Sequence, residues 1–381
     1  MARNRVHSQV QAAYVGPAPA TGFHFITSAG VLNDNFTDPS GLNLIQQLDR
    51  VQSIGYDESF DPEQVIQLGT RGFVDRPLIK PPEVELSFDY YIKGIANEAK
   101  LGFDVNYEFN DGLYYTPRVC PISGFYNRQL KRIAKPDPFQ IFTHKDFRNM
   151  FFVVGDEYID VRTNESDSAN QLATFRTFDP KAPNYEVIGF GNCYINSYGI
   201  RAEVGDFPTA SVSYVCENIQ YTTSGSGITA PAVDKKYASN LNRHVVIPRT
   251  VYDGGPTILK PGDITLTLSG NGQLYDAGLD FNDAKIQNFN LDMQFDREQL
   301  RSLGWKLPLD RQINFPVLAT LTTDLILGDG VSGNLMNAFT GYNNYNLQIK
   351  MLNNSGCVTD PRPAFLIDVF QAKLRTASFK S

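Results

Sequence analysis

Residues 51–92, VQSIGYDESFDPEQVIQLGTRGFVDRPLIKPPEVELSFDYYI, and residues 286–327, IQNFNLDMQFDREQLRSLGWKLPLDRQINFPVLATLTTDLIL, are two copies of one segment. With a constant offset of 235 and no gap, 13 of the 42 positions are identical. Unrelated segments of ordinary composition would share about two or three positions. We interpret the similarity as an internal duplication and expect both copies to fold in the same way.

Each copy is predicted to form a strand, a projecting loop and a second strand. In the first copy, Asp61 has the position of a helix N-cap, with Pro62 after it and Gln64 three residues on. This pattern predicts one helical turn or a tight loop. Gly69 and its equivalent Gly304 stand where the returning chain needs a residue with positive φ.

The dipeptide Asp-Arg recurs at residues 75–76 and 310–311, near the end of each loop. One reading is an ion pair that holds the shape of the loop. The other is that each arginine binds a carboxylate of a neighbouring subunit or ring, because its planar donors suit bidentate pairing. The candidates for such contacts are Asp61, Gly69, Arg71, Asp75, Arg76, Asp296, Gly304, Lys306, Asp310 and Arg311.

Most other windows alternate apolar and polar residues with a period of two, as in residues 83–88, 210–215 and 264–268. Clusters of Gly, Pro, Asn and Asp separate these windows, which favours a mainly β, antiparallel architecture over a parallel βαβ one. Helical windows are few and short. The best of them is Leu42–Leu48.

The duplication predicts two tandem β-sandwich or barrel domains, each with a short flanking helix. We expect an N-terminal arm at 1–40, a first domain with an insertion at 41–221, a linker at 222–261 and a second domain at 262–381. The second copy has no equivalent of residues 209–219. We therefore expect a strand from the N-terminal arm, such as residues 23–27, or from a neighbouring chain to complete it.

The composition limits the classes of function. No apolar run is long enough for a signal peptide or a membrane span, and the net charge of −7 argues against a broad DNA-binding face. Charged residues make up only 20% of the chain, while aromatic residues make up 12%. A chain with few charged and many aromatic residues is expected to expose more apolar surface than a monomer tolerates, which favours an oligomer.

No motif points to catalysis, to a cofactor or to a metal. Residues 328–333 match G-x-G-x-x-G but lack the βαβ context and the later acid that a dinucleotide site needs. The four histidines are dispersed, and none has a second ligand at metal spacing. Cys193 and Cys216 could face each other across a hairpin, and we expect buried free thiols there. We therefore expect no enzyme and no cofactor.

The repeated unit, with Leu-Gly in its loop and Asp-Arg before a Pro-led strand, resembles the tail-tube proteins of tailed bacteriophages, and residues 189–219 resemble the closing part of that fold. The resemblance implies small β-sandwich domains that form a six-membered ring around a DNA channel. Two copies per chain imply a trimeric ring with pseudo-sixfold symmetry. The expected location is the virion tail, assembled in the host cytoplasm.

The resemblance further implies stacked homotrimers, contacts with other tail proteins (a sheath or terminator, a hub and a tape measure), and viral DNA that passes through the lumen without specific binding. A tail hub or tube-terminating protein, present as a single trimeric ring, is the alternative in the same class. A glycan-binding or glycosidase β-sandwich protein is a more remote one.

Overall fold

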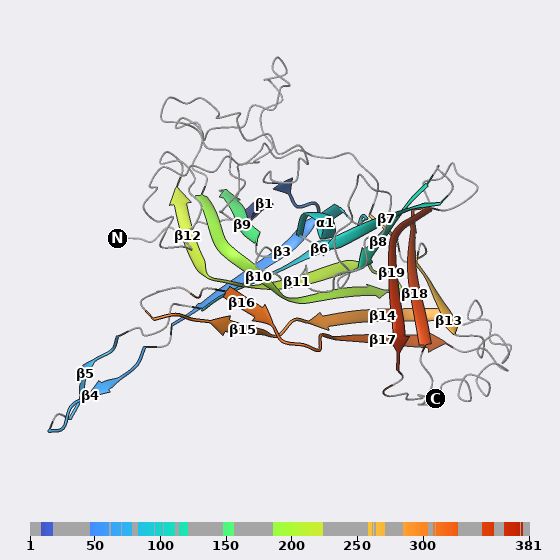
Figure 1. Ribbon diagram of the computed structural model, residues 1–381. Helices are drawn as coiled ribbons and strands as arrows, with labels where there is room; N and C mark the ends of the chain where they lie inside the picture. Colours follow the sequence, from blue (N-terminus) through green and yellow to red (C-terminus); the bar gives the residue numbers. More distant parts are fainter. Residues whose placement is uncertain are drawn as a thin grey trace, which may run out of the picture.

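The computed structural model describes residues 9–17, 46–60, 62–69, 71–77, 83–94, 96–101, 103–110, 114–120, 148–155, 186–223, 258–260, 262, 264–270, 285–303, 308, 310–326, 345–353, 362–373 and 375. The chain is mainly β, and almost all of its strands pair antiparallel, as the alternation of apolar and polar residues predicts (Figure 1).

The longest strand, β10 (Glu186–Glu203), organises a ten-stranded sheet. Its first half pairs with β9 (Arg148–Gly155) and β12 (Asn218–Thr223), and β9 continues to β1 (Gln9–Pro17) and β2 (Gln46–Gln47). At Asn192 the backbone has φ 48°, and the register with β9 shifts between Phe190 and Cys193. This irregularity lets one strand bend, so that its two halves pair with strands in two different parts of the sheet.

The second half of β10 lies inside a six-stranded part of the sheet. The strand order is β3 (Val51–Ser59), β6 (Glu83–Tyr91), β11 (Thr209–Cys216), β10, β14 (Lys285–Gln294) and β17 (Leu318–Ile326). Every neighbouring pair is antiparallel. In Figure 1 these strands run across the lower half of the molecule, with β1, β9 and α1 above them.

The two copies of the repeat form the two ends of this six-stranded part. Residue pairs of β3 with β6, such as Ile54 with Phe88, recur at the same offset of 235 in β14 with β17, as Phe289 with Thr323. Both hairpins also have a register shift at the same place, after Val51 and after Ile286. The expectation that both copies fold alike is confirmed for these hairpins.

A two-stranded ribbon connects the strands of each hairpin. The first ribbon consists of β4 (Val65–Ile66) and β5 (Phe73–Asp75), and the second of β15 (Arg297–Leu300) and β16 (Asp310–Ile313). Of the two alternatives predicted after position 61, one helical turn or a tight loop, the helical turn is wrong among the described residues, because β-branched and aromatic residues pair across the ribbon. Gly69 has φ 91°, which confirms the predicted positive φ.

A second sheet contains β13 (Ile264–Gly270), β18 (Tyr345–Asn353), β19 (Arg362–Ala372), β8 (Tyr114–Cys120) and β7 (Asp104–Asn110) in that order. The described residues contain one helix, α1 (Ala96–Leu101). The helix predicted at Leu42–Leu48 is wrong where the chain is described, because Gln46–Gln47 pair with β1.

Buried residues from both copies belong to one apolar cluster. Phe88 of the six-stranded part contacts Phe152 of β9 at 6.3 Å between ring centres, so the two parts of the bent sheet pack face to face. Phe289 and Met293 of the second copy join the same cluster. Within the predicted N-terminal arm, β1 buries Tyr14, and within the predicted linker Leu259 is buried and its N–H donates to Ile92 O. Residues 23–27 lie outside the described residues.

Candidate functional site

The six-stranded part of the sheet has one apolar face and one polar face. On β6, Val84, Leu86, Phe88 and Tyr90 are buried, while the residues between them point the other way. The polar face includes Ser53, Asp57, Ser59, Glu83, Glu85, Ser87, Asp89, Ser197, Arg201, Glu203, Ser211, Ser213, Asn288, Asn290, Asp292, Gln294, Thr320, Thr322 and Asp324. Rows of directly paired residues cross all six strands on this face.

One such row runs from Ser53 through Asp89, Ser211, Gly199 and Asp292 to Thr320. At the first end of this row, Ser53 Oγ donates to Asp89 Oδ2 at 2.8 Å. The equivalent contact in the second copy joins Asn288 Nδ2 to Asp324 Oδ2 at 2.6 Å. The duplication has thus preserved a carboxylate and its donor at both ends of the face.

The charged groups of this polar face are mostly acidic. Seven carboxylates lie on it, at positions 57, 83, 85, 89, 203, 292 and 324. Among its described side chains there is one basic residue, Arg201. Arg201 is itself paired with Glu203 at 2.5 Å. The face therefore presents hydroxyls, amides and negative charge, which is unsuited to holding phosphate.

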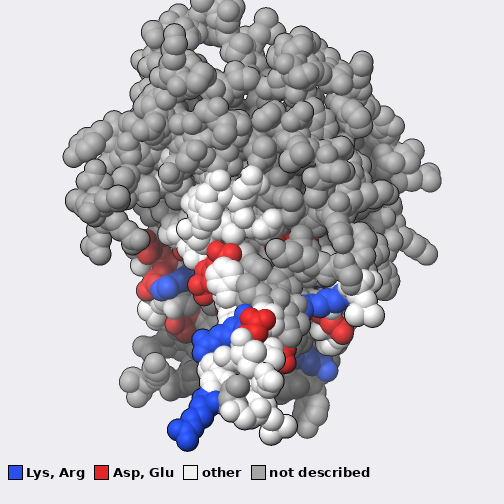
Figure 2. Space-filling model, turned by 90° about the vertical axis from the view of Figure 1, so that its left-hand side faces the viewer, with Lys and Arg blue, Asp and Glu red and all other residues white. Residues whose placement is uncertain are grey.

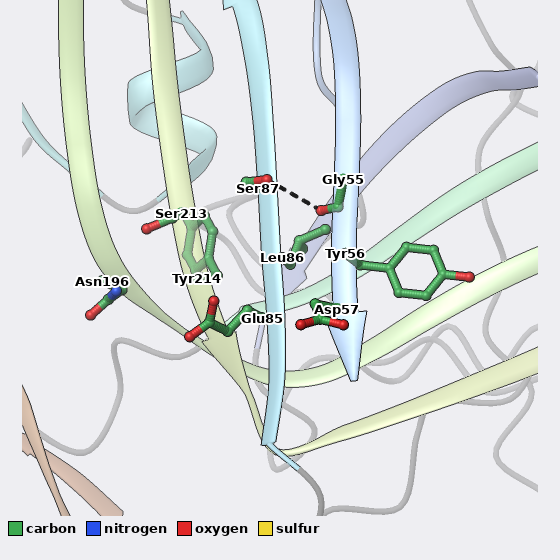
Figure 3. A pocket seen from close by; sticks show the side chains of 9 residues that line it. All are labelled: Gly55, Tyr56, Asp57, Glu85, Leu86, Ser87, Asn196, Ser213 and Tyr214. Atoms are coloured by element: carbon green, nitrogen blue, oxygen red, sulfur yellow. Dashed lines mark hydrogen bonds between the residues drawn. The ribbon is translucent and has the colours of Figure 1, made fainter. Parts of the chain in front are cut away.

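Asp57 and Glu85 lie directly opposite each other on β3 and β6. They border a shallow groove of about 270 Å³ that also contains Ser87, Ser213 and Asn196 (Figure 3). Ser87 Oγ donates to the carbonyl oxygen of Gly55 at 3.4 Å. Two carboxylates facing each other across strands destabilise a sheet, so folding alone does not account for this pair.

We expect the double change Asp57→Asn and Glu85→Gln to raise the free energy of unfolding of the isolated chain by up to about 0.5 kcal/mol, because it removes a like-charge pair. Urea unfolding at low salt measures it, and the gain should shrink at high salt. Asp324→Asn is the matched control, because Asp324 accepts a hydrogen bond from Asn288 and its loss offers no such gain. An equal gain in both variants would contradict the prediction.

The first ribbon carries several of the predicted contact residues on an exposed surface. Gly69 and Arg71 lie at its free end, and Asp75 and Arg76 lie near its base. Arg76 N–H donates to Asp75 Oδ1 at 2.7 Å, and the Arg76 guanidinium lies 4.4 Å from the centre of the Phe73 ring. Among the described residues, the two side chains thus form a turn contact and a cation–π contact instead of an ion pair.

The second ribbon places its arginine differently. Arg311 is only 6% exposed, and its NH1 lies 3.8 Å from Glu83 Oε1 in the first copy. Burial lowers the pKa of the Arg311 guanidinium, while the nearby carboxylates of Glu217 and Glu83 oppose that shift. Arg297 of the same ribbon donates from Nε to the carbonyl oxygen of Ile195 at 2.8 Å. The base of this ribbon is therefore docked within the chain.

Glu217, near Arg311, belongs to a buried polar group where β10 bends. Asn192 Nδ2 donates to Glu217 Oε2 at 2.9 Å, and Asn192 N–H donates to Asn149 Oδ1 at 3.0 Å. Cys193 and Cys216 lie beside it, with their Sγ atoms 2.8 Å apart. Both are buried free thiols, as the sequence predicted, and burial raises the pKa of Cys193.

Two of the remaining predicted contact residues, Asp296 and Asp310, lie at the second ribbon. Asp296 is exposed and its carbonyl oxygen accepts a hydrogen bond from Asn314 N–H at 2.8 Å. The backbone of Asp310 pairs with Leu300. Asp61, Gly304 and Lys306 lie outside the described residues. The two equivalent arginines of the repeat thus differ, with Arg76 exposed and Arg311 buried.

A buried carboxyl group was missed by sequence reasoning. Glu98 of α1 is fully buried, and its Oε1 accepts hydrogen bonds from Tyr90 at 2.8 Å and from Tyr198 at 3.1 Å. Burial raises the pKa of Glu98 to about 7, and the two tyrosine hydrogen bonds and Lys100 oppose that rise. No local signal marks Glu98, because Tyr198 lies 100 residues away in the sequence.

Helix α1 is also tied to the chain before β3. Asn97 Nδ2 donates to the carbonyl oxygen of Asp49 at 2.8 Å, and Lys100 Nζ forms an ion pair with Asp49 Oδ2 at 2.9 Å. These contacts hold the helix over the apolar face of the sheet, so the buried carboxyl of Glu98 stays with Tyr90 and Tyr198.

Within the described part of the chain, no helix is long and apolar enough to cross a membrane, and no three metal-binding side chains come together. The sequence matches no protein-family model and no curated protein. A function for this chain must therefore be inferred from the duplication, the polar face and the ribbons.

Proposed function

We propose that the chain is a non-enzymatic structural protein of a bacteriophage tail, which assembles as trimeric rings of pseudo-sixfold symmetry around a DNA channel and stacks them into a tube. The observation that carries the proposal is the six-stranded part of the sheet, which begins and ends with equivalent hairpins in the same register.

The outer strands of these hairpins supply the surfaces for ring closure. Among the described strands, β3 pairs with β6 and β17 pairs with β14, and neither has a partner on its outer side. Because all neighbours are antiparallel, β3 and β17 run in opposite directions. β17 of one copy can therefore pair antiparallel with β3 of the next. Closure into a barrel removes edges that otherwise favour aggregation.

Three copies would contribute eighteen strands to this barrel. With strands about 4.8 Å apart and tilted about 40°, the barrel is about 36 Å across between backbones. Side chains reduce the clear width to about 25 Å, which still admits a DNA duplex of about 20 Å. The trimer is therefore large enough for the proposed channel.

The polar face would line that channel. Its carboxylates repel phosphates and its hydroxyls and amides keep the surface wet, so DNA passes without specific binding. The apolar face lies inside the protein, where it packs against β1 and β9. The partners in this proposal are further copies of the chain, a sheath or terminator, a hub and a tape measure, and the location is the virion tail.

Negative-stain microscopy and light scattering of the purified protein test this proposal. We expect particles of three times 42.6 kDa and, at higher concentration, long hollow filaments. A tail hub or tube terminator, the second candidate, would give only discrete rings. A monomer at all concentrations that binds to a glycan array would overturn the proposal in favour of a glycan-binding protein.

A further inference from the structure

The two ends of the six-stranded part carry different surfaces. The ribbons follow the ends of β3 and β14. The turn between β10 and β11 lies at the opposite end, because Val204 N–H donates to the carbonyl oxygen of Gln287 at 2.9 Å, near the start of β14. One end therefore projects as ribbons, and the other ends in the turn at residues 204–208.

The first ribbon exposes apolar side chains around its free end. Leu68 is fully exposed, and Ile66, Phe73 and Val74 are also exposed. Arg71 supplies a positive charge beside them. Figure 2 looks onto this end of the molecule, where the projecting part is largely uncharged and has both basic and acidic side chains around it. An apolar projection of this kind marks an interaction site.

The turn at the opposite end has complementary properties. Val204 and Phe207 are exposed, and the Phe207 ring lies 5.5 Å from that of Tyr91 between centres. Glu203 is paired there with Arg201, which leaves Asp206 as the acidic residue of the turn, and its Oδ1 accepts a hydrogen bond from Phe207 N–H at 3.0 Å. Gly205, with φ 93°, makes the tight turn that presents them.

We propose that the first ribbon of one copy seats on the β10–β11 turn of a copy in the next ring, with Leu68 against Val204 and Phe207 and with Arg71 paired with Asp206. This inference rests on the proposed function. A second copy fits because both surfaces are apolar, their charges are opposite, and they lie at opposite ends of the same strands. Such a heterologous contact repeats without closing and builds a filament.

The second ribbon differs in that its base is already held within the chain through Arg297 and Arg311. In the first ribbon the equivalent arginine, Arg76, is exposed and lies against Phe73 of its own ribbon. This difference assigns the contact between rings to the first ribbon.

Charge exchange tests the contact. We expect Arg71→Glu and Asp206→Arg each to raise the critical concentration for filament formation at least about tenfold, because each places like charges together. The double variant, with both changes, should return it to within about threefold of the unchanged protein. Filament mass is measured by sedimentation and filament length by electron microscopy.

Arg301→Glu is the matched control, because it makes the same charge change on the second ribbon, where Arg301 already binds Gln299. We expect filaments as in the unchanged protein. The proposed contact between ribbon and turn is overturned if Arg301→Glu raises the critical concentration as much as Arg71→Glu does. It is also overturned if the double variant does not return the critical concentration toward that of the unchanged protein. The trimer should persist in all variants, and circular dichroism confirms that each is folded.

The two proposals fail separately. If the unchanged protein forms neither trimers nor filaments, the proposed function is wrong. If it forms filaments and the Arg71→Glu variant forms them equally well, the tube proposal stands and the contact between this ribbon and the turn is wrong.

Discussion

Replacing Arg311 with alanine is expected to lower the free energy of unfolding by about 3 to 5 kcal/mol, the usual cost of removing one partner from a buried charge pair. Arg311 is 6% exposed, and the carboxylate of Glu217 near it is 2% exposed. Without the guanidinium, Glu217 keeps a buried charge with less compensation. The base of the second ribbon also loses its contact with Glu83.

The duplication supplies the control for this prediction. Arg76 occupies the equivalent position in the first ribbon but is exposed, and we expect Arg76→Ala to change the free energy of unfolding by less than about 1 kcal/mol. Urea unfolding of both variants, followed by circular dichroism, gives the comparison. Equal effects would show that the burial of Arg311 contributes nothing to stability.

The strands of the two hairpins could be predicted from the sequence, because alternation marks each strand and the offset of 235 pairs the copies. The structure confirms both, including the shared register shift near the start of each first strand. The pairing of β14 with β10 could not be predicted. Alternation shows which face of a strand is buried but not which distant strand lies beside it.

The ribbons show where local signals mislead. The Asp-Pro pair at positions 61–62 is typical of a helix start, yet Val65 and Ile66 pair with the segment Phe73–Asp75. The repeat also predicts the same role for its two arginines, while the structure buries Arg311 and exposes Arg76. The difference arises because the second ribbon lies against the first copy, which is a tertiary effect that no short window contains.

The sequence alone does not show which acidic residues share one face of the sheet. Strand register is what places Asp57, Glu85 and Asp292 on one side of the sheet. Glu98 had no signal at all, since its neighbours in the sequence are those of an ordinary short helix. Its hydrogen-bond partners, Tyr90 and Tyr198, lie on β6 and β10.

Glu98 should make the stability of the protein depend on pH. Its pKa rises from 4.5 to about 7 because the carboxyl is buried. Below pH 4.5 the group is protonated in both the folded and the unfolded chain and does not lower the free energy of unfolding. Between pH 4.5 and about pH 7 the Glu98 carboxyl ionises in the unfolded chain but stays protonated in the folded chain. The free energy of unfolding therefore falls as pH rises. Above pH 7 the loss from this group is complete, at about 3 kcal/mol.

The change Glu98→Gln should remove this dependence, because glutamine keeps an oxygen acceptor for Tyr90 and Tyr198 but does not ionise. Urea unfolding of both proteins at several values between pH 5 and pH 8 isolates the contribution, since all other groups cancel in the difference. Relative to the unchanged protein, the variant should gain stability steadily as pH rises. Glu63→Gln, at an exposed position, controls for the loss of one negative charge. Parallel curves for the unchanged protein and the Glu98→Gln variant would mean that the buried carboxyl does not titrate in this range.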